Sequence, residues 1–166
     1  AFGKIVESGH LEKGFKPVHW CTDCGSALAE AEVEYQDKES PAIDVKFEIT
    51  EYVKFADAFG IATELLQQNR SSVVIWTTTP WTIPANRAIC LHPELIYELV
   101  EVTLENGKEN YVIAADLLET CMQRYAITEF NIIGSCAGAA LENLVVNHPL
   151  NPIQVPLILG DHVTTE

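Results

Sequence analysis

The sequence contains few positive charges. Lysine and arginine together account for 10 residues against 24 aspartates and glutamates, which leaves a formal net charge of −14. Proteins that hold nucleic acid along an extended surface need many lysines and arginines facing the phosphates. The scarcity of lysine and arginine argues against binding of nucleic acid along an extended surface. Local contact with a single nucleotide is compatible with it. The excess of aspartate and glutamate is expected to keep the chain soluble.

Long hydrophobic runs are also missing. No stretch approaches the roughly 20 apolar residues of a membrane helix, and residues 1–5 show no secretion-signal pattern. Five cysteines, an odd number, in a chain without such a signal favour a reducing compartment. We therefore expect a cytoplasmic chain with no membrane partner. Its 166 residues correspond to one domain or a piece of one, and both ends are expected to be cuts within a longer chain.

Several common catalytic fingerprints are absent. The sequence has neither a phosphate-binding Walker loop nor the glycine fingerprint of dinucleotide-binding folds. No histidine or carboxylate lies next to the hydroxyl-rich run in residues 71–86, so a serine–histidine–aspartate type of triad cannot be argued from spacing. Hydrolysis at that run would therefore use a positioned water and not a covalent intermediate.

The most informative stretch that is present is the segment 71–86. A short buried strand is predicted over residues 73–76, where β-branched and aromatic residues stand between serine and proline. Pro80 and Pro84 then forbid a regular helix or a central strand, so the residues around them are expected on a stiff, non-repetitive backbone. That backbone carries the polar and aromatic side chains of Thr77, Thr78, Thr79, Trp81, Thr82 and Asn86.

These side chains suit a neutral polar ligand with an aromatic part, such as a sugar, a nucleoside or an ester. Hydroxyls donate and accept hydrogen bonds without carrying charge, and an indole offers a flat stacking face and one N–H donor. Stiff loops on a rigid scaffold are also common places for binding sites. A plain structural interpretation, a threonine-rich turn around a core tryptophan, fits the composition equally well.

A second candidate site is the pair Cys21 and Cys24. Two cysteines at this spacing form half of a zinc knuckle, but a structural zinc site normally needs four ligands and the chain has no second pair. Trp20 directly before them also matches the thioredoxin redox pattern, which needs a preceding strand and a long following helix. A zinc half-site, structural thiols and a redox pair therefore all remain open from these residues alone.

Hydrophobic periodicity predicts a β-rich α+β fold that is barrel-like. Residues 43–49 alternate apolar and charged side chains as a half-buried strand does, and residues 52–68 carry apolar side chains at helical spacing. The dipeptide at 106–107, Asn-Gly, predicts a hairpin turn. Asp116 is expected to cap a helix, with Glu119 as its capping-box partner.

The chain is expected to divide near residue 35. Residues 1–35 are poor in periodicity and predict a linker with a cysteine knuckle, ending in a strand start at 32–35. Residues 36–166 carry the predicted strands and helices, including further strands over 129–133 and 154–159. They are therefore expected to form the main domain.

Three segments, which follow one another in the family's order, resemble the inserted editing domain of isoleucyl-tRNA synthetases. Residues 77–86 are similar to the threonine-rich signature of that domain, in the Pro-Trp-Thr-x-Pro-Ala-Asn form of the isoleucyl enzymes. Residues 16–35 resemble the linker that leads into the domain, and residues 155–163 supply the third match. Together the matches span nearly the whole chain.

The resemblance implies an α+β, barrel-like editing domain of the type found in valyl-, leucyl- and isoleucyl-tRNA synthetases. Such a domain hydrolyses valine wrongly esterified to the isoleucine tRNA, while the parent enzyme joins isoleucine to that tRNA using ATP. The implied partners are the valine-bearing 3′ end of the tRNA and the rest of the synthetase chain. The implied roles are catalytic for Thr77, Thr79 and Thr82, and substrate-binding for Thr78, Trp81 and Asn86.

The resemblance also implies that parts of the site lie outside this chain. The second editing element of the family, a Gly-Thr-Gly segment followed by His and Asp, is expected beyond Glu166, so the isolated fragment is expected to edit poorly or not at all. No cofactor is expected in the domain itself. Zinc at Cys21 and Cys24 would need ligands from outside the chain, and ATP with Mg²⁺ would belong to the parent's catalytic domain. The alternatives are a non-catalytic tRNA-binding or interdomain module and a thiol oxidoreductase built on the cysteine pair.

Overall fold

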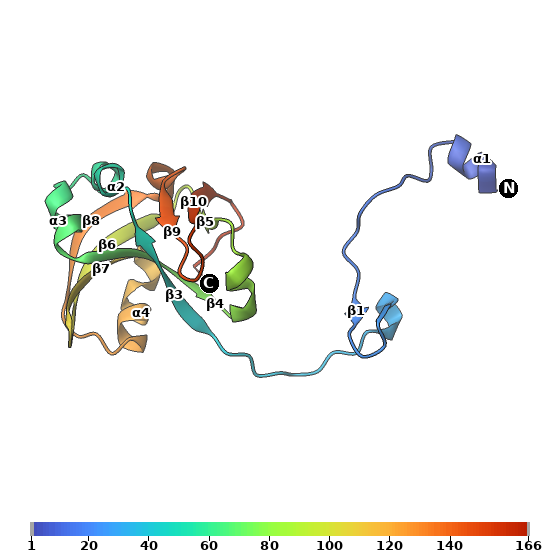
Figure 1. Cartoon of the computed structure of the whole chain (residues 1–166), viewed down its shortest axis with the longest axis horizontal. Coiled ribbons are helices and arrows are strands. Elements are labelled where there is room, and N and C mark those ends of the chain that lie inside the picture. Colours follow the sequence, from blue (N-terminus) through green and yellow to red (C-terminus); the bar gives the residue numbers. More distant parts are fainter. Residues whose placement is uncertain (1, 166) are drawn as a thin grey trace. The chain divides into compact units, whose positions relative to one another are not determined.

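The computed structural model describes residues 2–165, and the chain divides into two compact units, 1–39 and 40–166. The division falls slightly beyond the position expected from the sequence. Figure 1 labels the α-helices and most of the strands of both units. The α-helices in the described part are all too short to cross a bilayer.

The first unit has little regular structure. It contains helix α1 (Phe2–Glu7), the paired strands β1 (Trp20–Cys21) and β2 (Ser26–Ala27), and the 3₁₀ turn η1 (Glu30–Glu32). None of residues 2–39 is buried. The strand start expected at 32–35 is wrong, because Glu32 accepts a hydrogen bond from the Ala29 N–H at 2.8 Å and closes the 3₁₀ turn instead.

The second unit is built on one eight-stranded mixed sheet with the order β5-β10-β9-β3-β4-β7-β6-β8. The strands are β3 (Ile43–Ile49), β4 (Arg70–Thr77), β5 (Ile89–Leu91), β6 (Ile96–Leu104), β7 (Gly107–Ala114), β8 (Phe130–Ala137), β9 (Val145–Asn147) and β10 (Gln154–Leu159). The helical elements are α2 (Tyr52–Phe59), α3 (Thr63–Gln68), η2 (Pro80–Ala85), η3 (Ala115–Leu117), α4 (Leu118–Arg124) and η4 (Gly138–Leu141). The pairs β4–β7 and β5–β10 are parallel, and the other pairs in the sheet are antiparallel. The predicted β-rich α+β fold is confirmed.

In the second unit, some local predictions agree with the structure and others are wrong. The strand over 43–49 and the hairpin at Gly107 are confirmed. The single helix expected over 52–68 is instead two, because Gly60 adopts the left-handed conformation (φ 65°) and ends α2. Asp116 does not cap a helix: it lies inside η3, and α4 begins only after Leu117 without a side-chain cap.

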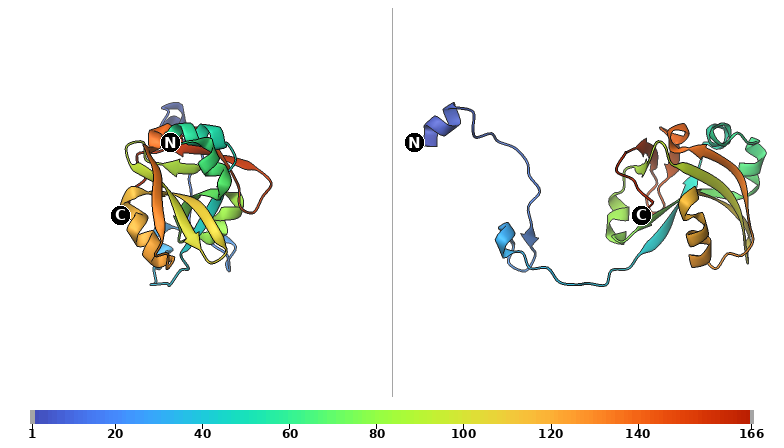
Figure 2. Two further views of the ribbon diagram at one scale, coloured as in Figure 1. Left: turned by 90° about the vertical axis from the view of Figure 1, so that its left-hand side faces the viewer. Right: turned by 180° about the vertical axis from the view of Figure 1, so that it is seen from behind.

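The two faces of the sheet bury separate hydrophobic cores. Helices α2 and α3 cover the larger core, around Phe47, Phe55 and Leu99, whereas α4 covers a smaller core around Val100 and Ile113. Figure 1 and Figure 2 show α4 apart from α2 and α3 on the curved sheet. Neighbouring residues of β6 therefore point to different cores, as alternation along a strand requires.

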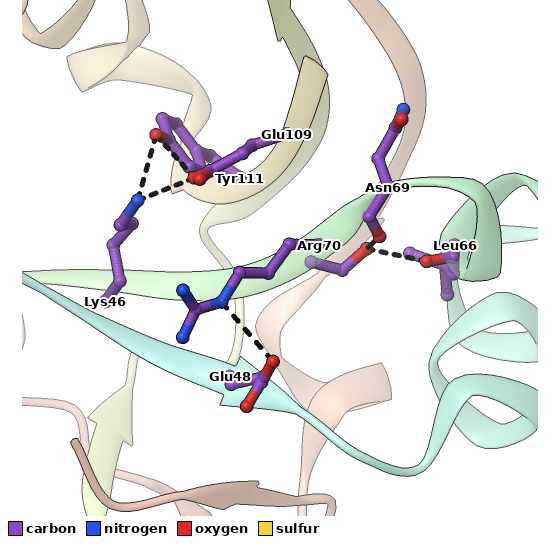
Figure 3. Close-up of polar contacts among 8 residues, drawn as sticks. Lys46, Glu48, Leu66, Asn69, Arg70, Glu109 and Tyr111 are labelled. Atoms are coloured by element: carbon purple, nitrogen blue, oxygen red, sulfur yellow. Dashed lines mark hydrogen bonds and ion pairs between the residues drawn. The ribbon is translucent and has the colours of Figure 1, made fainter. Parts of the chain in front are cut away.

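A buried polar pair fastens α3 to the sheet. Asn110 donates to the Ser71 hydroxyl at 3.0 Å and to the Leu65 carbonyl at 3.2 Å, and the Ser71 hydroxyl donates to the Leu66 carbonyl at 3.0 Å. Figure 3 draws the bond that reaches Leu66. Both side chains are almost fully buried and hydrogen-bonded. They pair with carbonyl groups at the end of α3, so neither side chain is left as a buried polar group without a partner.

Glu109 is the centre of an ionic contact between β7 and β3 (Figure 3). Its Oε2 lies 2.6 Å from Lys46 Nζ and accepts from the Tyr111 hydroxyl at 2.9 Å. Burial alone would raise the pKa of the Glu109 carboxyl, but these hydrogen bonds and the charges of Lys46 and Arg70 outweigh it and lower the pKa. The ionised form is therefore favoured in the folded chain.

The lowered pKa makes folding stability depend on pH. The contribution of Glu109 is complete above the ordinary glutamate pKa of 4.5 and is lost as pH falls through the lower folded value. Urea unfolding at pH 7 and pH 3 is expected to show a fall in stability that Glu109→Gln makes smaller by about 0.5–1 kcal/mol. Glu105→Gln, at the exposed hairpin turn, is the control. Equal falls in the two variants would contradict the assignment.

Candidate functional site

The threonine-rich segment leaves the sheet at the end of β4. Strand β4 pairs with β3 as far as Thr77 opposite Ile43, and the chain then enters η2. A proline is tolerated in the first turn of a helix, where its N–H would have no partner, so Pro80 opens η2. The expectation of a wholly non-repetitive backbone is therefore wrong: the prolines exclude an α-helix but permit a short 3₁₀ helix.

Three threonines of this segment form one hydrogen-bonded group, the threonine cluster Thr77, Thr79 and Thr82. The Thr77 hydroxyl oxygen accepts from the Thr79 N–H at 3.0 Å and lies 3.2 Å from the Thr79 hydroxyl oxygen. The Thr82 hydroxyl donates to the Thr79 carbonyl at 2.7 Å. The structure thus brings together the three residues to which the resemblance gave a catalytic role, with their oxygens at the end of a sheet strand.

The three expected substrate-binding residues lie around this cluster in different ways. Thr78 is exposed, and Trp81 is 64% exposed, so neither lies in a core. The alternative of a turn around a core tryptophan is therefore wrong. Asn86 donates to the Ala88 carbonyl at 2.9 Å, and its own side-chain oxygen is enclosed without a partner among the described residues. In this position Asn86 fixes the backbone at the point where the chain leaves η2.

The threonine cluster lines neither of two cavities in the second unit. One, of about 480 Å³, is polar and includes Lys46, Arg70 and His148. The other, of about 530 Å³, is mostly apolar and lies between the end of β4, α4 and residues 163–165. In the part of the chain that the structure describes, the cluster is therefore presented at the surface.

Sequence reasoning missed two side chains that contact the backbone of η2. His148 and Asn151 belong to the loop between β9 and β10, yet they reach the carbonyls of Ile83 and Pro84 at 2.8 Å each. The His148-Pro149 dipeptide predicts only a chain breaker, because no local pattern reveals a contact across more than 60 residues. The sequence shows only a histidine before a proline at this position, which does not indicate the contact.

The cysteine pair forms a knuckle in the first unit. Cys21 ends β1, and the Cys24 N–H donates to the Cys21 sulfur at 3.3 Å, with Gly25 in the left-handed conformation (φ 61°) closing the turn. The strands β1 and β2 are antiparallel and two residues long, and no long helix follows. The structural context that the thioredoxin motif requires is therefore absent from residues 2–39.

The thiols in the chain are expected to differ in reactivity. Hydrogen bonds from Cys24 and from Asp23 lower the pKa of the Cys21 thiol, whereas burial raises the pKa of the Cys136 thiol to about 11. Because the thiolate is the reactive form, iodoacetamide at pH 7 is expected to label Cys21 at least about tenfold faster than Cys136, after treatment with a chelator. Peptide mass mapping gives both rates. Comparable rates would contradict the assigned environments.

Comparison with known proteins identifies the family. The family described as tRNA synthetases class I (I, L, M and V) matches residues 1–148. The chain belongs to this family.

The curated relatives of this synthetase chain include isoleucine–tRNA ligases. The isoleucine–tRNA ligase of Pseudoalteromonas atlantica is 60% identical over 164 residues, covering 99% of this chain and 17% of the relative. That of Idiomarina loihiensis is 54% identical over 168 residues, covering 100% of this chain and 18% of the relative. This synthetase chain therefore spans less than a fifth of the length of the ligases that it matches.

Two solved structures are similar in fold to this synthetase chain, and one of them is an editing domain. The editing domain of the P. knowlesi cytosolic leucyl-tRNA synthetase aligns with a TM-score of 0.62 at 10% identity, over 80% of this chain and 57% of that chain. GlLeuRS-CP1 aligns with a TM-score of 0.54 at 14% identity, over 75% of this chain and 49% of that chain. At such identities the likeness shows the fold, which is that of leucyl-tRNA synthetase editing domains.

Proposed function

We propose that this chain is part of an isoleucine–tRNA ligase and that residues 40–166 belong to its editing domain, which hydrolyses valine from mischarged isoleucine tRNA. The observation that carries the proposal is the threonine cluster, in which three neutral hydroxyls are ordered at the end of a sheet strand. The isoleucyl form of the surrounding signature and the editing-domain fold support it. The acceptor end of a tRNA that carries valine is then the substrate.

Such a domain compensates for the limited ability of a single binding site to distinguish isoleucine from valine. One missing methylene in a hydrophobic pocket gives only modest discrimination, and isoleucine against valine is the standard worked case of that limit. A second site that admits valine and excludes isoleucine by size removes the error. Trp81, with its large exposed indole beside the cluster, is proposed as part of the excluding wall.

The chemistry proposed for the cluster is the positioning of water. Water attacks the ester carbonyl, the bond to the ribose oxygen breaks, and free valine and tRNA are released. Hydroxyls of Thr77, Thr79 and Thr82 hold the water and the ester, and donors directed at the carbonyl oxygen stabilise the charge that develops there. No covalent intermediate is required, because none of these hydroxyls has a histidine within hydrogen-bonding distance in the described structure.

The charge of the chain limits how it contacts tRNA. With a net charge of −14, it cannot supply the main phosphate contacts. The single-stranded 3′ end, by contrast, can be bound through its terminal adenine by stacking and hydrogen bonds. Thr78 and Asn86 are proposed for this role or for supporting the loop, and the phosphate contacts are assigned to the rest of the synthetase, which also binds ATP and Mg²⁺.

The cysteine knuckle is proposed as half of a structural zinc site. Within residues 2–165, no group of three or more histidine, cysteine or acidic side chains is arranged to hold a metal ion. Cys21 and Cys24 fit two positions of a tetrahedral site that takes thiolate ligands, and the lowered pKa of Cys21 favours the thiolate. The remaining ligands would come from outside the chain, and bound zinc would hold the knuckle to that part of the enzyme.

The full-length ligase that contains this chain tests the proposal. It is expected to release valine from Val-tRNA(Ile), whereas a variant in which a short Gly/Ser linker replaces residues 40–166 is expected to keep isoleucine charging and lose this hydrolysis. The isolated 166-residue chain is expected to deacylate at least about tenfold more slowly than the full-length enzyme, because the second editing element is expected beyond Glu166. Unchanged hydrolysis in the linker variant would overturn the proposal.

The second candidate function is a non-catalytic tRNA-binding or interdomain module. The exposure of Thr78 and Trp81 favours it, since exposed hydroxyl and indole groups bind without catalysing. Replacing Trp81 with alanine in the full-length enzyme separates the two functions. Weaker tRNA binding with an unchanged rate of hydrolysis at saturation would support the module.

A further inference from the structure

The 3₁₀ helix η2 is short and contains a proline in its interior. Pro84 lies inside the helix and has no backbone N–H, so the hydrogen bond that this position would donate to the preceding turn is missing. The hydrogen bonds at its two ends run from the Thr82 N–H to the Thr79 carbonyl at 3.0 Å and from the Asn86 N–H to the Ile83 carbonyl at 2.9 Å. A short 3₁₀ helix that lacks one internal hydrogen bond is held in one conformation by contacts from outside.

His148 supplies such a contact from the loop between β9 and β10. Its imidazole is 95% buried and packs edge-on against the Phe47 ring in the main core, with the ring centroids 5.8 Å apart and the planes at 79°. From this position Nε2 lies 2.8 Å from the Ile83 carbonyl oxygen. The ring therefore links the hydrophobic core to the backbone next to Thr82.

The hydrogen bonds around the ring determine its tautomer. Nδ1 accepts from the Leu150 N–H at 3.1 Å and from the Asn151 N–H at 3.0 Å, so it carries no proton. The proton must then be on Nε2, which donates to the Ile83 carbonyl. The neutral imidazole thus has a separate task on each nitrogen: Nδ1 closes its own loop, and Nε2 holds η2.

Asn151 makes a second contact with the same turn of backbone. Its side-chain amide donates to the Pro84 carbonyl at 2.8 Å. The His148 main-chain N–H also bonds to the Ile153 carbonyl at 2.9 Å, which closes the loop that carries both side chains. Two consecutive carbonyls of η2 are therefore held by one compact loop that is anchored in the core.

From these contacts we propose that His148 is a positioning residue of the editing site, and that its Nε2–H, assisted by Asn151, fixes η2 so that the threonine cluster and Trp81 keep their places. In this role His148 acts through Ile83, the residue after Thr82, and not through a contact with the substrate. The inference rests on the proposed function for its effect on catalysis, whereas the restraint of η2 is a property of the fold.

Two substitutions separate the tasks of the ring nitrogens. In His148→Asn the amide oxygen takes the place of Nδ1 and keeps the loop closed, but nothing reaches Ile83. In His148→Gln the amide nitrogen takes the place of Nε2 and still donates to Ile83.

In the full-length ligase, His148→Asn is expected to lower the kcat of Val-tRNA(Ile) hydrolysis by about tenfold to hundredfold, since small displacements of positioning groups cost that much. His148→Gln is expected to restore the rate to within about threefold of the wild type.

The control is Leu150→Ala, which trims a side chain that is 65% exposed in the same loop. It is expected to leave hydrolysis unchanged. A role in stability alone would make the rates of His148→Asn and His148→Gln fall together, in proportion to their melting temperatures. That result, or a wild-type rate in His148→Asn, would overturn the proposal.

Hydrogen exchange separates failure of this inference from failure of the proposed function. In the full-length protein, the amides of residues 81–83, 85 and 86 are expected to exchange at least about tenfold faster in His148→Asn than in the wild type and in His148→Gln. If wild-type enzyme does not hydrolyse Val-tRNA(Ile) but exchange shows this pattern, the editing function fails and the restraint of η2 stands. Unchanged exchange in His148→Asn would overturn the restraint itself.

Discussion

Replacing Phe55 with alanine is expected to lower the free energy of unfolding of the 166-residue chain by about 3–5 kcal/mol. The Phe55 side chain is fully buried on the inner face of α2, where it contributes to the larger core against the sheet. Truncation removes its transfer free energy and leaves a cavity that close-packed neighbours cannot fill. A loss of this size is a large part of the total stability of an ordinary domain, about 5–15 kcal/mol.

Val53 provides the matched control on the same helix. Its side chain is 60% exposed, and alanine is the better helix former, so Val53→Ala is expected to change stability by less than about 0.5 kcal/mol. Urea unfolding followed by circular dichroism measures both variants. Similar losses in the two variants would contradict the packing of α2 against the sheet.

Replacing Thr77 with valine is expected to lower the rate of Val-tRNA(Ile) hydrolysis by the full-length ligase by about a hundredfold, the scale of losing one group that positions or stabilises the reacting atoms. Valine has the same shape and suits a strand end, but it cannot accept from the Thr79 N–H or share a hydrogen bond with the Thr79 hydroxyl. The cluster then loses both a hydroxyl and the restraint on Thr79.

Thr103→Val is the control for this substitution. Thr103 is an exposed threonine of β6 whose side chain makes no hydrogen bond within the described chain, so its replacement is expected to leave hydrolysis unchanged. Isoleucine charging is expected to stay within about twofold of the wild type in both variants. A wild-type rate of hydrolysis in Thr77→Val would show that the cluster does not carry the reaction.

Local sequence patterns predicted secondary structure correctly where neighbouring residues determine it. The strand over 43–49 followed from strict alternation, and the hairpin followed from the Asn-Gly turn at 106–107. The helix break at Gly60 was less visible, because a glycine inside an apolar periodicity is compatible with either a weak helix or a cap. Asp116 failed as a cap because the preceding chain continues into a 3₁₀ turn that includes it.

The candidate site was found in the sequence only in part. Composition and the two prolines identified the segment that carries the threonine cluster, and the resemblance supplied its chemistry. The contacts that hold this segment, from His148 and Asn151, cross more than 60 positions and follow from sheet topology, which places the β9–β10 loop beside η2. No short-range pattern encodes such a contact.

The exposure of Trp81 bears directly on selectivity. An indole that is 64% exposed in residues 2–165 can exclude isoleucine only when it forms one side of a pocket that is completed by further groups. The second editing element, expected beyond Glu166, is proposed to supply the facing side. Size exclusion is therefore a property of the full-length enzyme in this proposal, whereas the order of the threonine cluster belongs to this chain.

The ratio of the rates at which the full-length ligase hydrolyses Val-tRNA(Ile) and Ile-tRNA(Ile), measured side by side under the same conditions, tests the second-sieve proposal most directly. The proposal predicts that valine is released at least about a hundredfold faster than isoleucine, and that Thr77→Val abolishes most of this difference by slowing the release of valine. Equal rates for the two aminoacyl-tRNAs, or a ratio that Thr77→Val leaves unchanged, would contradict it.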